Sequence, residues 1–194
     1  FAKRIKEKMR EEEKNAVVNF DLSKTVYDIN DIEKILPHRY PFLLVDRIVA
    51  MDNQTITGYK NITMNEPQFT GHFPGNPVLP GVCMLEGMAQ TAGVLIERTV
   101  EGRQLALLTT VDRARFQNFV RPGDQVRMEI ELEALEADLA RIRGTATVGE
   151  TTVASSRLTF KLVPPDLLIA PVFQPFWRQT IDTWLGKYLG GASG

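Results

Sequence analysis

The feature that most constrains the fold of this chain is residues 71–97, a proline- and glycine-rich loop followed directly by a nearly uncharged helix. Prolines fix φ and glycines permit tight turns, so the first part, GHFPGNPVLP, is expected to be stiff. From about Gly81 to Glu97, apolar residues recur at the spacing of one helical face. Most other positions are also small or apolar, which predicts a helix that is buried nearly all round.

Glu86 is the single charged residue between Gly81 and Ile96. An ionised carboxylate on a buried helix is costly unless a partner compensates it. Gln90 lies one turn later on the same face and is expected to hold Glu86 by a side-chain hydrogen bond. The pattern makes Glu86 a candidate for chemistry, with an ordinary helix-surface carboxylate as the alternative.

The chain has two histidines, His38 and His72. Neutral imidazole titrates near the working pH, so His72, at the start of the stiff loop, is a candidate general base. A satisfied polar loop residue is the alternative for His72. For His38, within the sequence PHRYP, a structural hydrogen-bonding role outweighs a catalytic one.

The start of the helix is a candidate binding site for developing negative charge. Free backbone N–H groups and the helix dipole at Gly81 and Val82 favour such charge, and Pro80 helps to fix this start. Gly81 also allows a substrate to approach closely. A base, an acid and an oxyanion site are therefore expected in one short segment.

Other reactive or charged residues carry weaker signals. Cys83 has apolar neighbours and is interpreted as a small core residue rather than a nucleophile, and metal-ligand spacing of Cys and His is absent. Arg113, Arg115 and Arg121 are expected to be solvated or, alternatively, to dock an acidic partner or a phosphate group.

Composition limits the class of protein. A net charge of −1 with 24% charged residues gives no general field for binding nucleic acid or an anionic membrane. No apolar run approaches the roughly 18 residues of a membrane span, and Phe1–Lys14 lacks the apolar segment of a signal peptide. One cysteine excludes an internal disulfide and suits a reducing compartment, so a cytoplasmic protein is expected.

The chain divides into three predicted parts: a charged extension and linker at 1–27, a domain at 28–163, and an extension at 164–194. The last part is expected to contain an amphipathic helix, Pro175–Leu189, and a flexible tail. The domain begins with a short helix, Asp28–Leu36, for which Asn30 is the expected N-cap with Glu33 three residues later.

Strand signals surround the central helix, which Gly102 is expected to close. Period-two alternation and turn residues predict strands at Phe42–Met51, Gln54–Thr63, Leu105–Arg115, Gln125–Leu135, Leu139–Val148 and Thr152–Val163. One helix against a long antiparallel sheet is an α+β layout. A single sheet covers one side of a helix, so a second subunit is expected to cover the rest.

Three motifs resemble those of a known family. HFPGNPVLPGVCMLEGMAQ matches the pattern HFPGxPxxPGVxxxExxAQ of 3-hydroxyacyl-[acyl-carrier-protein] dehydratases with the hot-dog fold, and LPHRYPFLLVDRI and VRPGD match two further landmarks. The resemblance covers about Ile29 to Val163. It implies a long helix wrapped by a curved antiparallel sheet, in a homodimer with two composite sites that is often assembled as a trimer of dimers.

The resemblance also implies a chemistry. The substrate is a (3R)-hydroxyacyl thioester on the phosphopantetheine arm of acyl carrier protein, in type II fatty acid biosynthesis, with no further cofactor and no metal. His72 is the general base and Glu86 the general acid, contributed by opposite subunits. The Gly81 amide binds the thioester oxygen, and the acyl tunnel is lined by residues such as Phe73, Val82 and Met88.

Details of the motif point to a branch of the family. Relatives that also isomerise the product from trans-2 to cis-3 usually carry Asp at the acidic position, so Glu86 favours the dehydratase-only branch. In some bacteria such a dehydratase resembles the C-terminal half of a fusion with a deacetylase of lipid A biosynthesis, and a charged start without Met fits such a half. A hot-dog thioesterase and a non-catalytic acyl-thioester sensor are the alternative functions.

Overall fold

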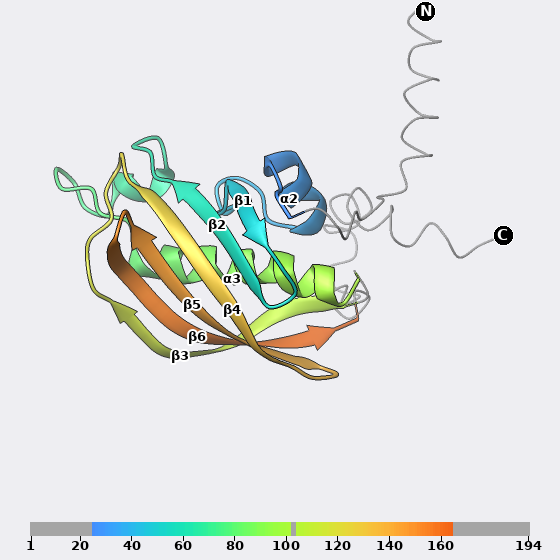
Figure 1. Cartoon of the computed structure of the whole chain (residues 1–194). Coiled ribbons are helices and arrows are strands. Elements are labelled where there is room, and N and C mark those ends of the chain that lie inside the picture. Colours follow the sequence, from blue (N-terminus) through green and yellow to red (C-terminus); the bar gives the residue numbers. More distant parts are fainter. Residues whose placement is uncertain (1–24, 102–103, 165–194) are drawn as a thin grey trace, which may run out of the picture. The chain divides into compact units, whose positions relative to one another are not determined.

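The structure, a computed structural model, describes residues 25–101 and 104–164 (Figure 1). The predictions for the terminal extensions and for Gly102 lie outside these residues. The elements in chain order are α2 (Ile29–Ile35), β1 (Arg47–Met51), β2 (Thr55–Asn61), the 3-10 helix η1 (Pro67–Thr70), α3 (Gly81–Thr99), β3 (Leu105–Phe116), β4 (Gln125–Leu135), β5 (Leu139–Val148) and β6 (Thr151–Val163).

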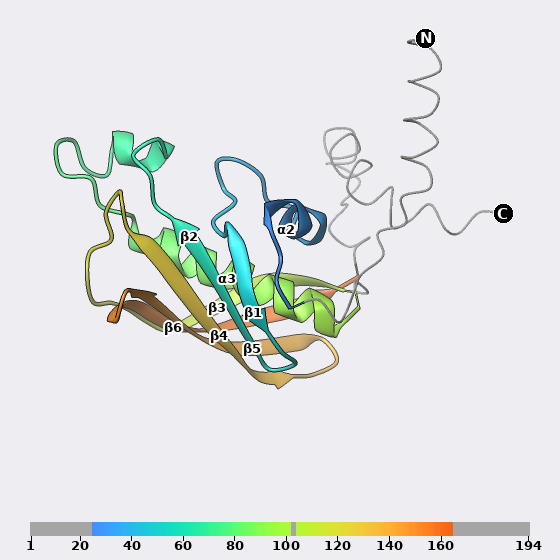
Figure 2. The ribbon, with the colours of Figure 1, turned by 45° about the horizontal axis from the view of Figure 1, so that its top comes forward.

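The six strands form one antiparallel sheet in the order β1-β2-β4-β5-β6-β3. The sheet curves around α3, which lies inside the curve and contacts β2 to β6 (Figures 1 and 2). This is the predicted α+β arrangement of one long helix wrapped by a curved antiparallel sheet.

The core lies between α3 and the concave face of the sheet. On β4, for example, Val126, Met128 and Ile130 are buried, whereas the residues between them are exposed. Because successive side chains of a strand point to opposite faces, this alternation places one apolar row against the helix. Each fully buried side chain of this size contributes on the order of 1.5–3 kcal/mol, so the row anchors the sheet to α3.

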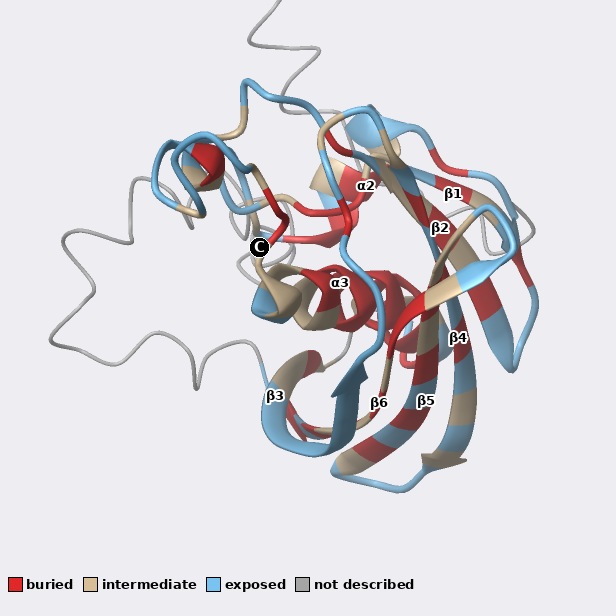
Figure 3. Ribbon diagram, turned by 90° about the vertical axis from the view of Figure 1, so that its left-hand side faces the viewer, coloured by how far each residue is buried: buried red, intermediate tan, exposed pale blue. Residues whose placement is uncertain are grey.

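The predicted burial of α3 holds from Gly87 to Glu97, where nearly every residue is buried (Figure 3). It fails in the first turn, where Val82 is 66% exposed. The exposed surface continues onto β3, whose residues are exposed from Leu108 to Phe116. The helix start and this terminal strand therefore carry exposed apolar side chains in the single chain.

The predicted N-cap of the first helix is wrong. Asp28, not Asn30, caps α2, because its Oδ1 accepts a hydrogen bond from the Asp31 backbone N–H at 3.0 Å. Asp31 Oδ2 accepts in return from the Asp28 N–H at 3.3 Å, completing a capping box. Asn30 lies inside the first turn. Asn and Asp cap helices equally well, so residue type alone does not distinguish Asp28 from Asn30, two positions later.

The first predicted strand is also partly wrong, since β1 begins at Arg47 rather than Phe42. The reason is a side chain on α3. Gln90 Oε1 accepts from the Leu44 N–H at 2.8 Å, and Gln90 Nε2 donates to the Phe42 carbonyl at 2.7 Å. The Phe42 carbonyl and the Leu44 N–H are thus bound by the helix, and pairing with β2 begins only at Asp46, whose N–H donates to the Tyr59 carbonyl at 2.9 Å.

Other boundaries differ less. β2 is shorter than predicted at both ends, β3 and β6 each extend one residue further, and β4 and β5 match the predicted ranges. At the end of α3, Glu101 follows the C-cap Val100 and takes a positive φ of 54°, in the left-handed region.

Candidate active site

The loop before α3 closes on itself around His72. The ring Nδ1 of His72 lies 2.7 Å from the Val78 carbonyl oxygen, and the Val78 N–H donates to the His72 carbonyl at 3.0 Å. A carbonyl can only accept, so Nδ1 carries the hydrogen. Nε2 is then the nitrogen with a lone pair, which is what a general base requires.

Phe73 gives the imidazole an apolar neighbour. Its ring stacks on the His72 ring with centroids 4.0 Å apart, and 52% of the residue is exposed. The peptide bond that joins the two residues is cis. An exposed aromatic ring beside a basic nitrogen can contact the apolar part of a substrate while the nitrogen removes a proton from that substrate.

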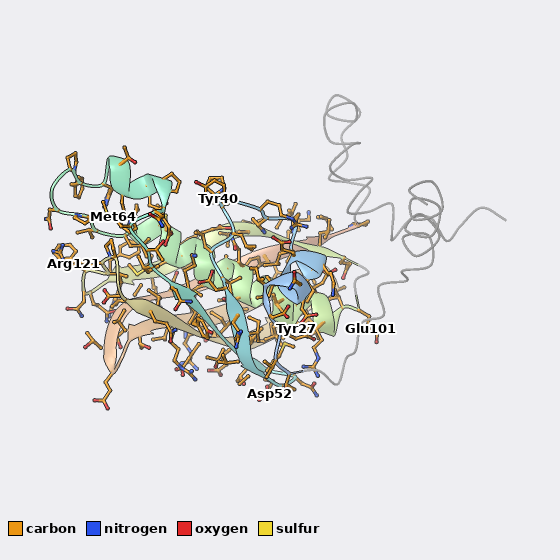
Figure 4. All side chains as sticks on the ribbon, turned by 90° about the horizontal axis from the view of Figure 1, so that it is seen from above. Tyr27, Tyr40, Asp52, Met64, Glu101 and Arg121 are labelled. Carbon is orange, nitrogen blue, oxygen red and sulfur yellow. The ribbon has the colours of Figure 1, made fainter. Side chains whose placement is uncertain are left out.

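The loop is tied to the turn before β4. Arg121 Nη1 donates to Asn76 Oδ1 at 2.7 Å and contacts the Pro77 carbonyl at 3.3 Å, and the Leu79 N–H donates to the Val120 carbonyl at 2.8 Å. Arg121, labelled in Figure 4, is therefore engaged in holding the loop.

The other two predicted docking arginines lie elsewhere. Arg113 and Arg115 are exposed on β3, where Arg113 has a positive φ of 52° at an irregularity in the pairing with β6. Their predicted role in docking an acidic partner remains a prediction.

The first residues of α3 offer backbone donors. Pro80 is the N-cap, and the first amides of a helix, here Gly81 and Val82, have no intrahelical acceptor. A Cβ on Gly81 would lie 2.8 Å from the ring of Phe116, so a larger residue would have to displace this ring. The position requires glycine for a close approach between helix and strand.

Glu86 lies in the second turn of α3 with its side chain 21% exposed. Gln90 Nε2 donates to Glu86 Oε1 at 2.9 Å, which confirms the predicted hydrogen bond. His38 Nε2 lies 3.4 Å from the same oxygen. The sequence indicated a structural role for His38 and held no signal that it reaches this carboxyl.

Within the described part of this one chain, no hydrogen bond or ion pair joins His72 to Glu86. The base candidate and the acid candidate are each held in place, by Val78 and by Gln90, but they are not brought together in one copy.

The comparison with known families decides the classification. The FabA-like domain family matches residues 36–157, which include the loop, the start of α3 and the sheet. The chain belongs to the FabA-like family.

Two relatives of this FabA-like chain are each named 3-hydroxyacyl-[acyl-carrier-protein] dehydratase FabZ. The protein from Solibacter usitatus is 52% identical over 139 residues, covering 71% of this chain and 86% of the relative. The protein from Pelotomaculum thermopropionicum is 49% identical over 135 residues, covering 69% and 96%.

Solved structures share the fold of this FabA-like chain. The dehydratase heterocomplex ApeI:P from Xenorhabdus doucetiae matches with a TM-score of 0.61 at 19% identity, covering 71% of this chain and 94% of that one. A mutant thioesterase from Pseudomonas aeruginosa matches with a TM-score of 0.56 at 15% identity, covering 71% and 95%. The predicted hot-dog fold is confirmed, and the fold alone does not separate dehydratases from thioesterases.

Of two further predicted residues of the FabA-like chain, Met88 is a core residue, whereas Cys83, predicted to be a small core residue, is only partly buried. Met88 is fully buried, and its Sδ would be 2.8 Å from a Cβ on Gly144 of β5, so it packs against the sheet in this chain. Cys83 lines a small pocket with Lys60 and Glu66, among other residues. Burial, and then the nearby carboxylates of Glu66 and Glu86, raise the pKa of the Cys83 thiol, which disfavours the thiolate of a nucleophile.

No group of three or more His, Cys, Asp or Glu side chains in the described ranges is placed to hold a metal ion. Among the same residues, no helix is both long and apolar enough to cross a membrane.

Proposed function

We propose that the chain is a 3-hydroxyacyl-[acyl-carrier-protein] dehydratase that converts (3R)-hydroxyacyl-acyl carrier protein to the trans-2-enoyl product in type II fatty acid biosynthesis in the cytoplasm. The observation that carries the mechanism is the loop around His72, which holds Nδ1 on the Val78 carbonyl and leaves Nε2 with the lone pair of a base. The names of relatives about half identical to this chain support the substrate class.

In the proposed first step, the thioester oxygen accepts a hydrogen bond from the Gly81 amide at the start of α3. This bond makes the C2 proton more acidic, because the negative charge that develops on the oxygen is stabilised. Removing one preorganised donor of this kind from an enzyme typically costs about 2.7–4 kcal/mol in the transition state. His72 Nε2 takes the C2 proton.

In the proposed second step, the C2 electron pair forms the C2–C3 double bond and the C3–O bond breaks. Protonated Glu86 gives its proton to the leaving hydroxyl, directly or through a water molecule, so the hydroxyl leaves as water. To restore the enzyme, His72 passes its proton to Glu86, or His72 releases a proton to solvent while Glu86 takes one up. Phosphopantetheine takes part only as the arm that carries the acyl chain.

The proposed active unit is a homodimer, with His72 of one subunit and Glu86 of the other in each site. Two observations support a second copy: the two residues do not meet within the described part of one chain, and β3 is a terminal strand of the sheet. Exposed apolar side chains gather on and around this strand and the helix start, namely Leu108, Val111, Phe116, Phe119, Val82 and Phe73. Assembly of three dimers into a hexamer is a further part of this proposal.

The test is hydration of a crotonoyl thioester and dehydration of the hydroxyacyl substrate, with product analysis. The expected product is the enoyl thioester, and His72→Ala and Glu86→Gln should each lose most turnover while remaining folded. Near-normal turnover of His72→Ala would defeat the assignment of the base. Release of a free acid would indicate a thioesterase instead, and binding of the thioester without turnover would indicate a sensor.

A further inference from the structure

The segment between α2 and β1 brings a second histidine to the carboxyl of Glu86. His38 Nε2 lies 3.4 Å from Glu86 Oε1, and the ring of His38 packs near Phe42, with centroids 6.2 Å apart. A distance of 3.4 Å is longer than the about 2.7–3.2 Å of an ordinary N–H···O bond. Catalytic hydrogen bonds are often long without substrate and shorten in the complex.

Two anchors hold this segment, one to α3 and one to the end of α2. Gln90 binds the backbone of Phe42 and Leu44, as described above. Arg39 donates through Nη1 to the Leu36 carbonyl at 2.8 Å and through Nη2 to the Glu33 carbonyl at 2.9 Å. Its cation thus lies at the C-terminal end of α2, where the helix dipole favours positive charge. The position of His38 is consequently set by contacts on both of its sides.

The surroundings of His38 select its tautomer. Nδ1 is buried and has no hydrogen-bond partner in the described chain. A buried N–H without an acceptor costs more than a buried lone pair without a donor, so the hydrogen is expected on Nε2, facing Glu86. Burial lowers the pKa of His38, Glu86 acts in the opposite direction, and Arg39 adds to the lowering. His38 is therefore a neutral donor near neutral pH.

Both contacts are made to the same oxygen of Glu86. Gln90 donates to Oε1 at 2.9 Å, and His38 Nε2 faces Oε1 as well. An oxygen that accepts two hydrogen bonds is a poor place for the acid proton, which is then expected on Oε2. A neutral donor also orients the carboxyl, whereas a cation in its place would stabilise the ionised form of the carboxyl.

We propose that His38 is a positioning residue of the dehydratase: with Gln90 it holds Glu86 Oε1, so that Oε2 carries the proton given to the leaving hydroxyl. This inference rests on the proposed function, because it assigns a role to a residue that acts through the proposed acid. It predicts that His38 affects the chemical step more than substrate binding.

The experiment compares His38→Ala and His38→Gln in the full-length protein, with Lys34→Ala as the control. Lys34 is an exposed residue of α2 that pairs with Asp31 and does not contact Glu86. The side-chain nitrogen of Gln can reach the position of the imidazole Nε2 and donate the same bond. Steady-state kinetics of crotonoyl thioester hydration and thermal unfolding are measured for each variant and for Glu86→Gln.

The expected result is a fall in kcat of about 10- to 100-fold for His38→Ala with KM little changed, which is the scale of a hydrogen bond to a charged or reacting group. His38→Gln should recover most of the loss, and Lys34→Ala should behave as the unmodified protein.

Three results would overturn the inference. If His38→Ala is as active as the unmodified protein while Glu86→Gln is inactive, the proposed function stands and the role of His38 fails. If His38→Ala and His38→Gln lose activity equally and unfold at equally lowered temperatures, His38 is only structural. If Glu86→Gln turns over normally, the proposed acid fails, and the role of His38 fails with it.

Discussion

His72 Nδ1 and the Val78 carbonyl oxygen are 2.7 Å apart, although the two residues stand at opposite ends of a proline-rich loop. This contact orients the imidazole and restricts it to one tautomer, and the backbone bond from the Val78 N–H to the His72 carbonyl holds the two residues together. The loop thus prepares the proposed base before any substrate arrives, which lowers the cost of orientation in the reaction.

This relationship predicts that the fold and the base function of His72 can be separated. The side-chain nitrogen of Asn can replace Nδ1 as the donor to Val78, but Asn has no group at the place of Nε2. His72→Asn should therefore unfold close to the temperature of the unmodified protein while turnover falls by about 10²–10⁴-fold, the usual contribution of general base catalysis. Hydration kinetics and thermal unfolding measure both effects, and substantial activity in His72→Asn would contradict the assignment.

The arginines predicted to dock an acidic partner are expected to divide into two groups. Arg121 holds Asn76 and Pro77 of the loop, so Arg121→Ala should lower kcat for acyl carrier protein substrates and for small thioesters alike. Loss of its exposed hydrogen bonds should cost roughly 1 kcal/mol of stability.

Arg115→Ala should raise KM for the carrier-linked substrate alone, and the difference in KM from the unmodified protein should shrink as salt increases. Equal effects of Arg115→Ala on both substrates would exclude docking at this residue.

The exposed strand β3 predicts how the oligomer can be broken. A charge at Val111, which is 42% exposed in the single chain, should be tolerated by the fold but not by an apolar subunit interface. Val111→Glu should shift the solution mass toward the 21.8 kDa of one chain and abolish activity, whereas the exposed β6 control Lys161→Glu should remain an oligomer. Analytical ultracentrifugation measures the mass, and a fully active Val111→Glu monomer would refute the composite site.

Glu97 predicts a pH dependence of stability. It is buried on α3 with 7% of the residue exposed, and burial raises its pKa from 4.5 to about 7. The folded state then binds more protons than the unfolded state between these values, so this group lowers the free energy of unfolding as pH rises through that window. Above neutral pH, the full difference in the pKa of Glu97 between the two states lowers the free energy of unfolding by roughly 3 kcal/mol.

Glu97→Gln removes this titration and keeps the size of the side chain. Relative to the unmodified protein, it should gain stability progressively from about pH 5 to pH 8. Denaturant unfolding at several pH values measures the difference in free energy of unfolding between the two proteins. Burial lowers the pKa of His38, so this residue makes stability rise with pH, but its contribution is the same in both proteins and cancels in the difference. A difference that does not vary with pH would show that Glu97 titrates normally in the folded state.

The loop, the central helix and most strands could be predicted because their signals are local. Alternation along Gln125–Leu135 and helical spacing after Gly81 report which side of each element faces the core, and the structure agrees with both. The bond between Gln90 and Glu86 was predictable for the same reason, since one helical turn separates them. The start of β1 was not, because Gln90 takes over backbone groups of Phe42 and Leu44, more than forty residues earlier in the chain.

The sequence by itself determined the fold class, the stiff loop and the identity of the candidate base and acid, because residue type and short-range spacing are enough to specify them. Only the tertiary structure decided that His38 faces Glu86 and that Arg121 binds Asn76. These pairs join segments far apart in the chain, and their geometry depends on how the sheet, the helix and the loops pack together. No periodicity in the sequence encodes that packing, because it is the sum of many weak contacts distributed over the whole domain.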